Sequence, residues 1–208
     1  MLDLPLLATY VVVVLGLFAV PGPAVLLTLA RAISGGRRVG IATGLGIASG
    51  DLVHTLMAAI GLSALLMTSA LAFEIVKYLG VAYLVYLGVA SLFERTQNLR
   101  IPSARRVAPF QAYRQAVLTE ILIPKTALFF LSFLPQFVRP ASGSVAAQLA
   151  LLGLIFVALS AVYTSLIAIG AGGFARWLSR HPGIGRWQGK VVGSIYLALG
   201  ARLALQER

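Results

Sequence analysis

Long apolar runs make up most of the chain, and short polar or basic segments separate them. A transmembrane helix needs about 20 apolar residues to cross roughly 30 Å of hydrocarbon. Six windows are long enough, at about residues 4–30, 41–67, 71–92, 115–137, 146–170 and 189–205. The pattern predicts six transmembrane helices, with almost nothing left for a soluble domain. Because no basic residue precedes the first window, we expect it to stay as a helix rather than to be cleaved as a signal peptide.

Prolines interrupt the first and fourth windows, within Val20–Ala24 (VPGPA) and Ile123–Ala127 (IPKTA). Proline removes a hydrogen bond from a helix and clashes with the preceding turn. A bilayer tolerates this only where the freed carbonyl groups meet protein, water or a ligand. Such breaks at corresponding places in two halves of a chain indicate the substrate site of a transporter.

The two halves of the chain also resemble each other in sequence. Three segments match three later ones in the same order: Val20–Leu27 with Ile123–Phe130, His54–Gly61 with Tyr163–Gly170, and, with a one-residue gap, Tyr83–Gly88 with Tyr196–Gly200. Each half holds three spans, an odd number, so the second half enters the membrane from the opposite side. The sequence therefore predicts an all-α integral membrane protein built as a 3+3 inverted repeat, with proline-broken helices 1 and 4.

We expect residues 1–208 to form a single transmembrane domain. Its first repeat would cover about 1–93 and its second about 115–208, with a cytoplasmic linker at about 94–114 between them. The linker holds five arginines and two prolines and no long apolar run.

Composition and charge agree with a multi-pass membrane protein. The chain is 59% hydrophobic and 11% charged, with a mean hydropathy of +0.92 and a net charge of +11. Twelve of its 17 basic residues lie in the connections that follow the first, third and fifth spans. The positive-inside rule places these connections in the cytoplasm and both termini outside. We read the positive charge as topological and attracted to anionic lipid, not as a nucleic-acid surface.

The sequence gives no support to an enzyme. It contains no HExxH or CxxC motif, no glycine-rich phosphate loop and no serine in a nucleophile elbow. It has no cysteine, which excludes disulfides and thiolate metal sites. We therefore expect no catalytic residues, no metal and no cofactor.

Asp51 is the most informative polar residue. Counting from the cytoplasmic ends of the windows, Asp51, Pro21 and Pro124 lie 10 or 11 residues deep, about 15 Å, which is near the bilayer midplane. A carboxylate at that depth costs about 2.5–3.5 kcal/mol and usually faces a cavity or a partner. We expect Asp51 to carry a proton or to bind a cationic group; the alternative is a hydrogen bond to a neighbouring helix.

Small residues recur every four positions around Asp51, in the sets Gly40, Gly44, Ala48 and Ala42, Gly46, Gly50. Faces of this kind let transmembrane helices approach closely. We expect these glycines to serve mostly in packing.

Three further polar residues lie near the predicted midplane or the second break. Lys125 would bind a substrate carboxylate, pair with Asp51 or Glu120, or extend toward an interface. Glu120 would line a cytoplasmic vestibule or form an interfacial ion pair. His54, one turn after Asp51, would relay protons or simply pack with one hydrogen bond.

Four motifs together resemble the LysE/RhtB family of amino-acid exporters: PGPA at Pro21–Ala24, GIASGD at Gly46–Asp51, YLVYLG at Tyr83–Gly88 and PKTALFFLSFLPQF at Pro124–Phe137. The resemblance covers nearly the whole chain. It implies a multi-pass transporter of the inner membrane that exports amino acids or related metabolites, driven by the proton gradient. The family usually has Asn-Pro-Lys at the second break, whereas this chain has Ile123 before Pro124, and Glu120 stands where another polar residue is common. Substrate choice would differ accordingly.

The resulting hypothesis is alternating access with two groups of functional residues. The substrate site would consist of Pro21, Gly22, Pro23, Asp51, Pro124 and Lys125, and proton coupling would use Asp51, His54 and Glu120. Its partners would be an amino acid or analogue, protons and membrane lipid. A passive channel, a membrane-embedded enzyme or a structural subunit are the alternatives, and a homodimer stays open.

Overall fold

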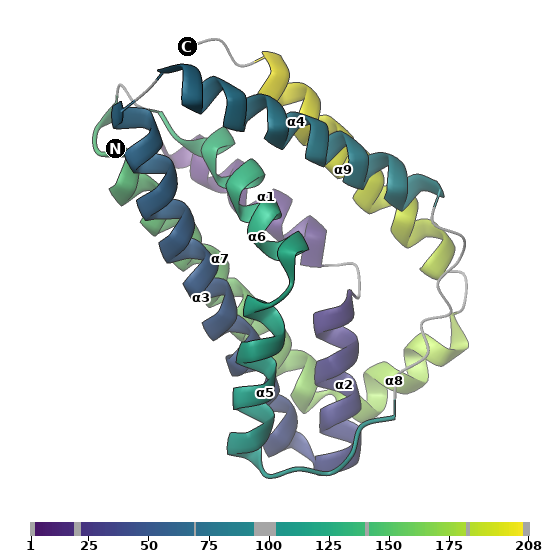
Figure 1. The fold of residues 1–208 in the computed structure, drawn as a ribbon. Helices are drawn as coiled ribbons and strands as arrows, with labels where there is room; N and C mark the ends of the chain where they lie inside the picture. Colours follow the sequence, from purple (N-terminus) through teal and green to yellow (C-terminus); the bar gives the residue numbers. More distant parts are fainter. Residues whose placement is uncertain are drawn as a thin grey trace.

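The computed structural model describes residues 3–18, 22–68, 70–93, 103–139, 142–181 and 184–205, and these residues form helices and no strand. Figure 1 shows their arrangement. The helices, in chain order, are α1 (Leu4–Phe18), α2 (Pro23–Gly35), α3 (Arg37–Thr68), α4 (Ala70–Phe93), α5 (Pro109–Ile121), α6 (Pro124–Phe133), the 3₁₀ helix η1 (Leu134–Phe137), α7 (Val145–Ile169), α8 (Ala171–Arg180) and α9 (Ile184–Leu205). The expected all-α fold is confirmed.

Two described helices are long and apolar enough to cross a membrane alone. They are Arg37–Gly61 within α3 and all of α7, Val145–Ile169. The bent pairs α1–α2 and α5–α6 raise the number of candidate spans to four if each pair crosses once. The apolar parts of α4 and α9, Tyr78–Phe93 and Lys190–Ala201, are shorter. The chain is thus an integral membrane protein with two to four candidate spans, and six spans stay a prediction.

Both predicted proline breaks appear as bends. The helix axis turns by 57° between α1 and α2 and by 60° between the two parts of the second pair. Each second helix starts with proline, Pro23 in α2 and Pro124 in α6, where the missing N–H is tolerated because the first turn has no partner for it. The preceding residues, Gly22 and Ile123, are extended.

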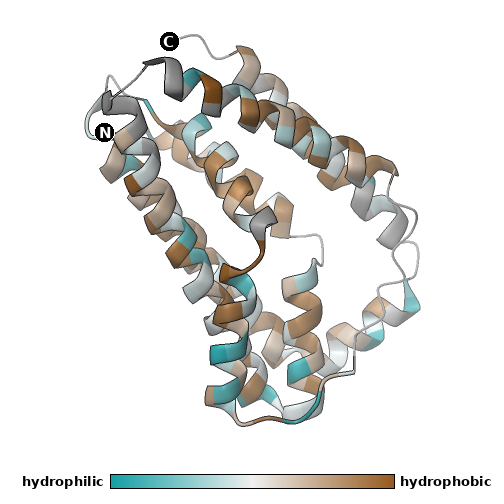
Figure 2. Cartoon of the chain, viewed as in Figure 1, coloured by the Kyte–Doolittle hydropathy of each residue, from teal (hydrophilic) through white to brown (hydrophobic). Residues whose placement is uncertain are grey.

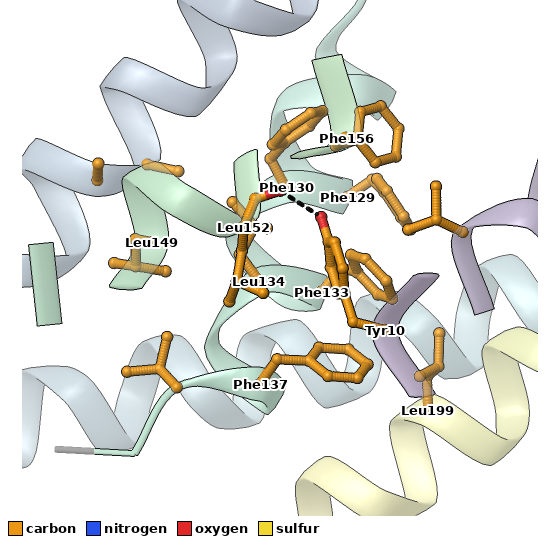
Figure 3. Packing of buried hydrophobic residues seen from close by; sticks show 14 of the residues in the cluster. Tyr10, Phe129, Phe130, Phe133, Leu134, Phe137, Leu149, Leu152, Phe156 and Leu199 are labelled. Carbon is orange, nitrogen blue, oxygen red and sulfur yellow. Dashed lines mark hydrogen bonds between the residues drawn. The ribbon is translucent and has the colours of Figure 1, made fainter. Parts of the chain in front are cut away.

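An aromatic cluster joins α1 to α6, η1 and α7 (Figure 3). Tyr10 of α1 stacks on Phe133, with ring centroids 5.4 Å apart, and meets Phe137 edge-on at 5.0 Å. Its hydroxyl donates a 2.8 Å hydrogen bond to the carbonyl of Leu152 in α7. The buried Tyr10 hydroxyl therefore has a hydrogen-bond partner, and burying this tyrosine in an apolar cluster leaves no unpaired polar group at this position.

The central contact of the fold is between α3 and α7, which run side by side (Figure 1). A Cβ placed on Gly44 would lie 2.5 Å from Oγ1 of Thr164, and one placed on Gly153 would lie 2.0 Å from Cγ2 of Thr55. Only glycine permits these distances. The expected close approach of helices at the small residues is therefore present.

A second close pair, α4 and α9, lies along one side of the molecule (Figure 1). A Cβ on Gly88 would lie 2.7 Å from Leu197, and one on Gly200 would lie 3.4 Å from Leu84. Several apolar residues of α4 are exposed, including Tyr78 and Tyr86, which are more than half exposed. Figure 2 shows the hydrophobic colouring along both helices.

The structure differs from the sequence prediction in two connections. Helix α5 begins at Pro109 rather than near residue 115, because proline suits the first helical turn. Residues 171–180, which we had placed in a connection, form the short helix α8, whose Phe174 packs against α2 and α7 residues. Side chains of Arg31 and Arg106 hold the extended segment before α5 by bonding to the carbonyl groups of Arg105 and Ser34, at 2.6 and 2.7 Å.

The α3–α7 contact predicts a strong effect of substitution at Gly153. Gly153→Leu should destabilise the protein by about 1–3 kcal/mol, because the new side chain would overlap Thr55. Gly61→Ala is the control, since a Cβ at Gly61 meets nothing within 4 Å. Thermal unfolding in detergent measures both. An unchanged melting temperature for Gly153→Leu would contradict the packing.

Candidate functional site

Asp51 lies at the middle of α3 and connects it to α7. Its side chain is 4% exposed. The hydroxyl of Ser160 in α7 donates a 2.9 Å hydrogen bond to Oδ2 of Asp51, and the Thr55 hydroxyl donates to the Asp51 backbone carbonyl, also at 2.9 Å. A buried carboxyl group therefore sits between the two central helices with a hydroxyl partner.

Glu120 lies in the last turn of α5, directly before the second proline break. It is 7% exposed, and the hydroxyl of Thr126 in α6 donates a 2.8 Å hydrogen bond to its Oε1. This bond spans the break. A Cβ on Gly50 would lie 2.4 Å from Cβ of Glu120, so glycine beside Asp51 makes room for the glutamate.

His54 connects α3 to the broken end of α5. Its Nε2 lies 3.0 Å from the backbone carbonyl oxygen of Glu120. In an uninterrupted helix that carbonyl would accept from residue 124, but Pro124 has no N–H. Ile123 donates to the same oxygen at 3.2 Å, and His54 provides a second donor. The histidine thus compensates for the hydrogen bond that the proline removes.

This contact fixes which ring nitrogen of His54 is available. A carbonyl oxygen only accepts hydrogen bonds, so Nε2 must carry the hydrogen. Nδ1 is buried and has no hydrogen-bond partner among the described residues. In the neutral ring, Nδ1 therefore presents a free lone pair to an N–H or O–H donor.

Aromatic side chains border the polar cluster on the side of α6. The ring of Phe130 lies 6.1 Å from that of His54, and Phe156 of α7 packs edge-on against Phe130 at 4.9 Å. These rings belong to the aromatic cluster around Tyr10 (Figure 3). One side of the polar cluster is thus packed with apolar groups.

The structure brings together three of the predicted site residues: Asp51, His54 and Glu120. Lys125 lies in the first turn of α6, but its side chain and that of Pro124 lie outside the described part of the structure. Pro21 lies outside it as well. Gly22 and Pro23 start α2, and the described hydrogen bonds of the cluster come from α3, α5, α6 and α7.

The side chain of Glu120 is buried in the protein, and its place in a vestibule or an ion pair stays a prediction. We had placed it in a cytoplasmic vestibule or in an interfacial ion pair, because it follows Arg114 by only six residues. However, α5 begins at Pro109, so Glu120 lies about three turns into the helix rather than near its start. Its described partner is the Thr126 hydroxyl.

Sequence reasoning missed Ser160 and Thr126, the two hydroxyl groups that bond to the carboxyl groups. Serine and threonine are common in apolar helices, so neither residue is conspicuous alone. The repeat did hold a signal for Ser160, because extending the His54–Tyr163 alignment back by three residues places Ser160 opposite Asp51. Among the described residues, no three His, Asp or Glu side chains are arranged to hold a metal ion.

Comparison with known proteins gives consistent matches along the chain. The family model of the LysE type translocator matches residues 15–207. An uncharacterized membrane protein of Pseudomonas aeruginosa is 34% identical over 201 residues, which cover 94% of this chain and 93% of that protein. A leucine efflux protein of Salmonella choleraesuis is 26% identical over 197 residues, with the same two shares. An uncharacterized membrane protein of Vibrio cholerae is 30% identical over 188 residues, covering 88% of this chain and 89% of its own. No solved structure matches.

The geometry predicts that cysteines at positions 51 and 160 can be joined. The chain has no native cysteine, so Asp51→Cys with Ser160→Cys leaves one reactive pair. A short bis-methanethiosulfonate reagent should cross-link it, which mass spectrometry of a proteolytic digest would detect. The control pairs Asp51→Cys with Val162→Cys, because Val162 is 59% exposed on α7. Equal cross-linking of both pairs would contradict the described contact.

Proposed function

The chain belongs to the LysE type translocator family, and on that premise we propose that it exports amino acids or related small metabolites from the cytoplasm in exchange for protons. The observation that carries the proposal is the buried cluster of Asp51, His54 and Glu120 beside the second proline break. Titratable groups inside a membrane are costly and usually belong to a substrate or proton pathway.

The substrate class follows from the relatives and from the chemistry of the cluster. The relatives from Salmonella are named leucine efflux proteins. An amino acid carries an ammonium and a carboxylate. The carboxyl groups and the free Nδ1 of His54 suit the ammonium, whereas the start of α6 and the charge of Lys125 suit the carboxylate. The start of α2, with Pro21, Gly22 and Pro23, would contribute in the same way.

The coupling mechanism requires one group to serve two ligands in turn. Asp51 would bind either the substrate ammonium or a proton, so that each excludes the other and their movements become coupled. His54 and Glu120 would pass the proton between Asp51 and the aqueous side. The hydrogen bond from His54 Nε2 to the backbone carbonyl of Glu120 holds the two residues next to each other, which supports a common role.

We also propose six spans arranged as a 3+3 inverted repeat in the inner membrane, with both termini outside. Equivalent helices pack on each other, α3 on α7 and α4 on α9. Tyr10 and Tyr113, which are 103 residues apart like the two proline breaks, bond to α7 and α3 respectively, at Leu152 and Ser49. The arginine contacts near α2 and α5 support a cytoplasmic location for that end, where hydrophilic residues gather (Figure 2).

Asp51→Asn and Lys125→Met should each lower amino-acid efflux by roughly 100-fold or more, the effect expected when a charge proposed to bind the substrate is removed. The assay is efflux of radiolabelled amino acids from proteoliposomes under a pH gradient. Glu74→Gln and Lys190→Met are the controls, because both side chains are exposed, and both should retain efflux. Wild-type rates in the first two variants would refute their proposed roles.

Glu120→Gln should separate substrate exchange from proton coupling. We expect the variant to retain counterflow of labelled against unlabelled substrate but to lose efflux driven by a pH gradient, because the amide cannot carry the proton. A protonophore should abolish gradient-driven efflux in the wild type. A passive channel would instead ignore the protonophore, and that outcome would overturn the antiport proposal.

A further inference from the structure

The two central helices contact each other in a reciprocal way. The repeat alignment that pairs Thr55 with Thr164 also pairs Gly44 with Gly153, since both pairs are 109 residues apart. Gly44 lies against Thr164, and Gly153 lies against Thr55. A two-fold axis produces this pattern, in which two surfaces exchange the same contacts.

The second helix pair repeats the pattern. The alignment of Tyr83–Gly88 with Tyr196–Gly200 pairs Leu84 with Leu197 and Gly88 with Gly200. A Cβ on Gly88 would lie 2.7 Å from Leu197, whereas one on Gly200 would lie 3.3 Å from Val85 and 3.4 Å from Leu84. The second helix pair therefore follows the same relationship more loosely than the first.

Asp51 and Ser160 occupy a special place in this arrangement. They are also 109 residues apart, so each is the counterpart of the other, and they are joined by a hydrogen bond of 2.9 Å. A position that contacts its own counterpart must lie at the axis. The pseudo-two-fold axis therefore passes between Asp51 and Ser160, where α3 and α7 lie side by side (Figure 1).

The Ser160 hydroxyl can bond to the Asp51 carboxyl group in both its charged and its protonated state. A hydroxyl both donates and accepts hydrogen bonds. The Ser160 hydroxyl donates to the charged carboxylate and accepts from the protonated carboxyl group. It can therefore hold Asp51 in one place whether or not Asp51 carries a proton, and alanine cannot.

We propose that Ser160 is a positioning residue that holds the Asp51 carboxyl group at the pseudo-two-fold axis, and that positions 51 and 160 are interchangeable for transport. The inference rests on the proposed function and assigns Ser160 a role in it. At the axis, a carboxyl group has the same position relative to both repeats. Substrate and protons can therefore reach it from either side of the membrane, and the carboxyl group need not move along the membrane normal.

Substitution of Ser160 tests the positioning role, because loss of positioning should change the KM of transport and leave the maximal rate nearly unchanged. In proteoliposomes, Ser160→Ala should raise the KM for the transported amino acid roughly tenfold, the size of one hydrogen bond to a charged group, with little change in maximal rate. Ser160→Thr should restore the KM because it retains the hydroxyl. Ser132→Ala is the matched control, since Ser132 is 3% exposed but bonds within α6. A wild-type KM for Ser160→Ala, or no rescue by threonine, would overturn the role.

Exchange of the two residues tests the axis itself. Asp51→Ser should abolish efflux, and adding Ser160→Asp should restore at least about a tenth of the wild-type rate, because the same carboxyl–hydroxyl pair is rebuilt with the repeats exchanged. Amounts of reconstituted protein are equalised by gel. An inactive double variant at wild-type amount would refute interchangeability. If the double variant does not insert, the KM comparison above decides the positioning role.

Different results would refute the proposed function and the proposed role of Ser160. Wild-type efflux by Asp51→Asn would refute the proposed function. Loss of efflux in Asp51→Asn together with a wild-type KM in Ser160→Ala would refute only the role of Ser160.

Discussion

The need to pair every polar group inside the membrane shapes this protein. Pro124 cannot give the carbonyl group of Glu120 its usual helical donor, and hydrocarbon offers no replacement. The N–H of Ile123 lies 3.2 Å from that oxygen. His54 reaches across from α3 to that oxygen. The helix break thereby contributes to where the histidine lies, and its Nδ1 is buried with no hydrogen-bond partner among the described residues. The helix break at Pro124 and the candidate proton site are therefore linked through His54.

Glycine makes this arrangement possible because it lets the helices approach. Gly50 gives space to Glu120, and Gly44 and Gly153 let α3 and α7 meet against threonine side chains. Bulkier residues would separate α3 from its partners, so that Asp51 would lose the Ser160 hydroxyl and His54 would lose the backbone carbonyl of Glu120. The small residues therefore serve packing, as the sequence pattern predicted, and packing in turn places the polar residues.

The sequence predicted much of the fold because its strongest signals are local. Apolar runs gave the helices, and prolines gave the two bends. It also proposed Asp51 from the cost of burying a carboxylate, and His54 and Glu120 from their places in the chain, and the roles of all three stay predictions. The start of α5 at Pro109, which the apolar pattern did not predict, places Glu120 about three turns into that helix. Ser160 and Thr126 escaped notice because a hydroxyl in an apolar helix has no distinctive pattern, and only the three-dimensional pairing shows what it bonds to.

The central claim is that a buried carboxyl–hydroxyl pair between two oppositely oriented repeats is reached from both sides of the membrane in turn. Accessibility of a single cysteine at position 160, which retains Asp51, tests it most directly. We predict that a membrane-impermeant thiol reagent labels Ser160→Cys slowly in right-side-out and in inside-out vesicles, and that transported amino acid slows both reactions. Labelling from one side only, or as fast as at the exposed loop residue Gly143 changed to cysteine, would contradict the account.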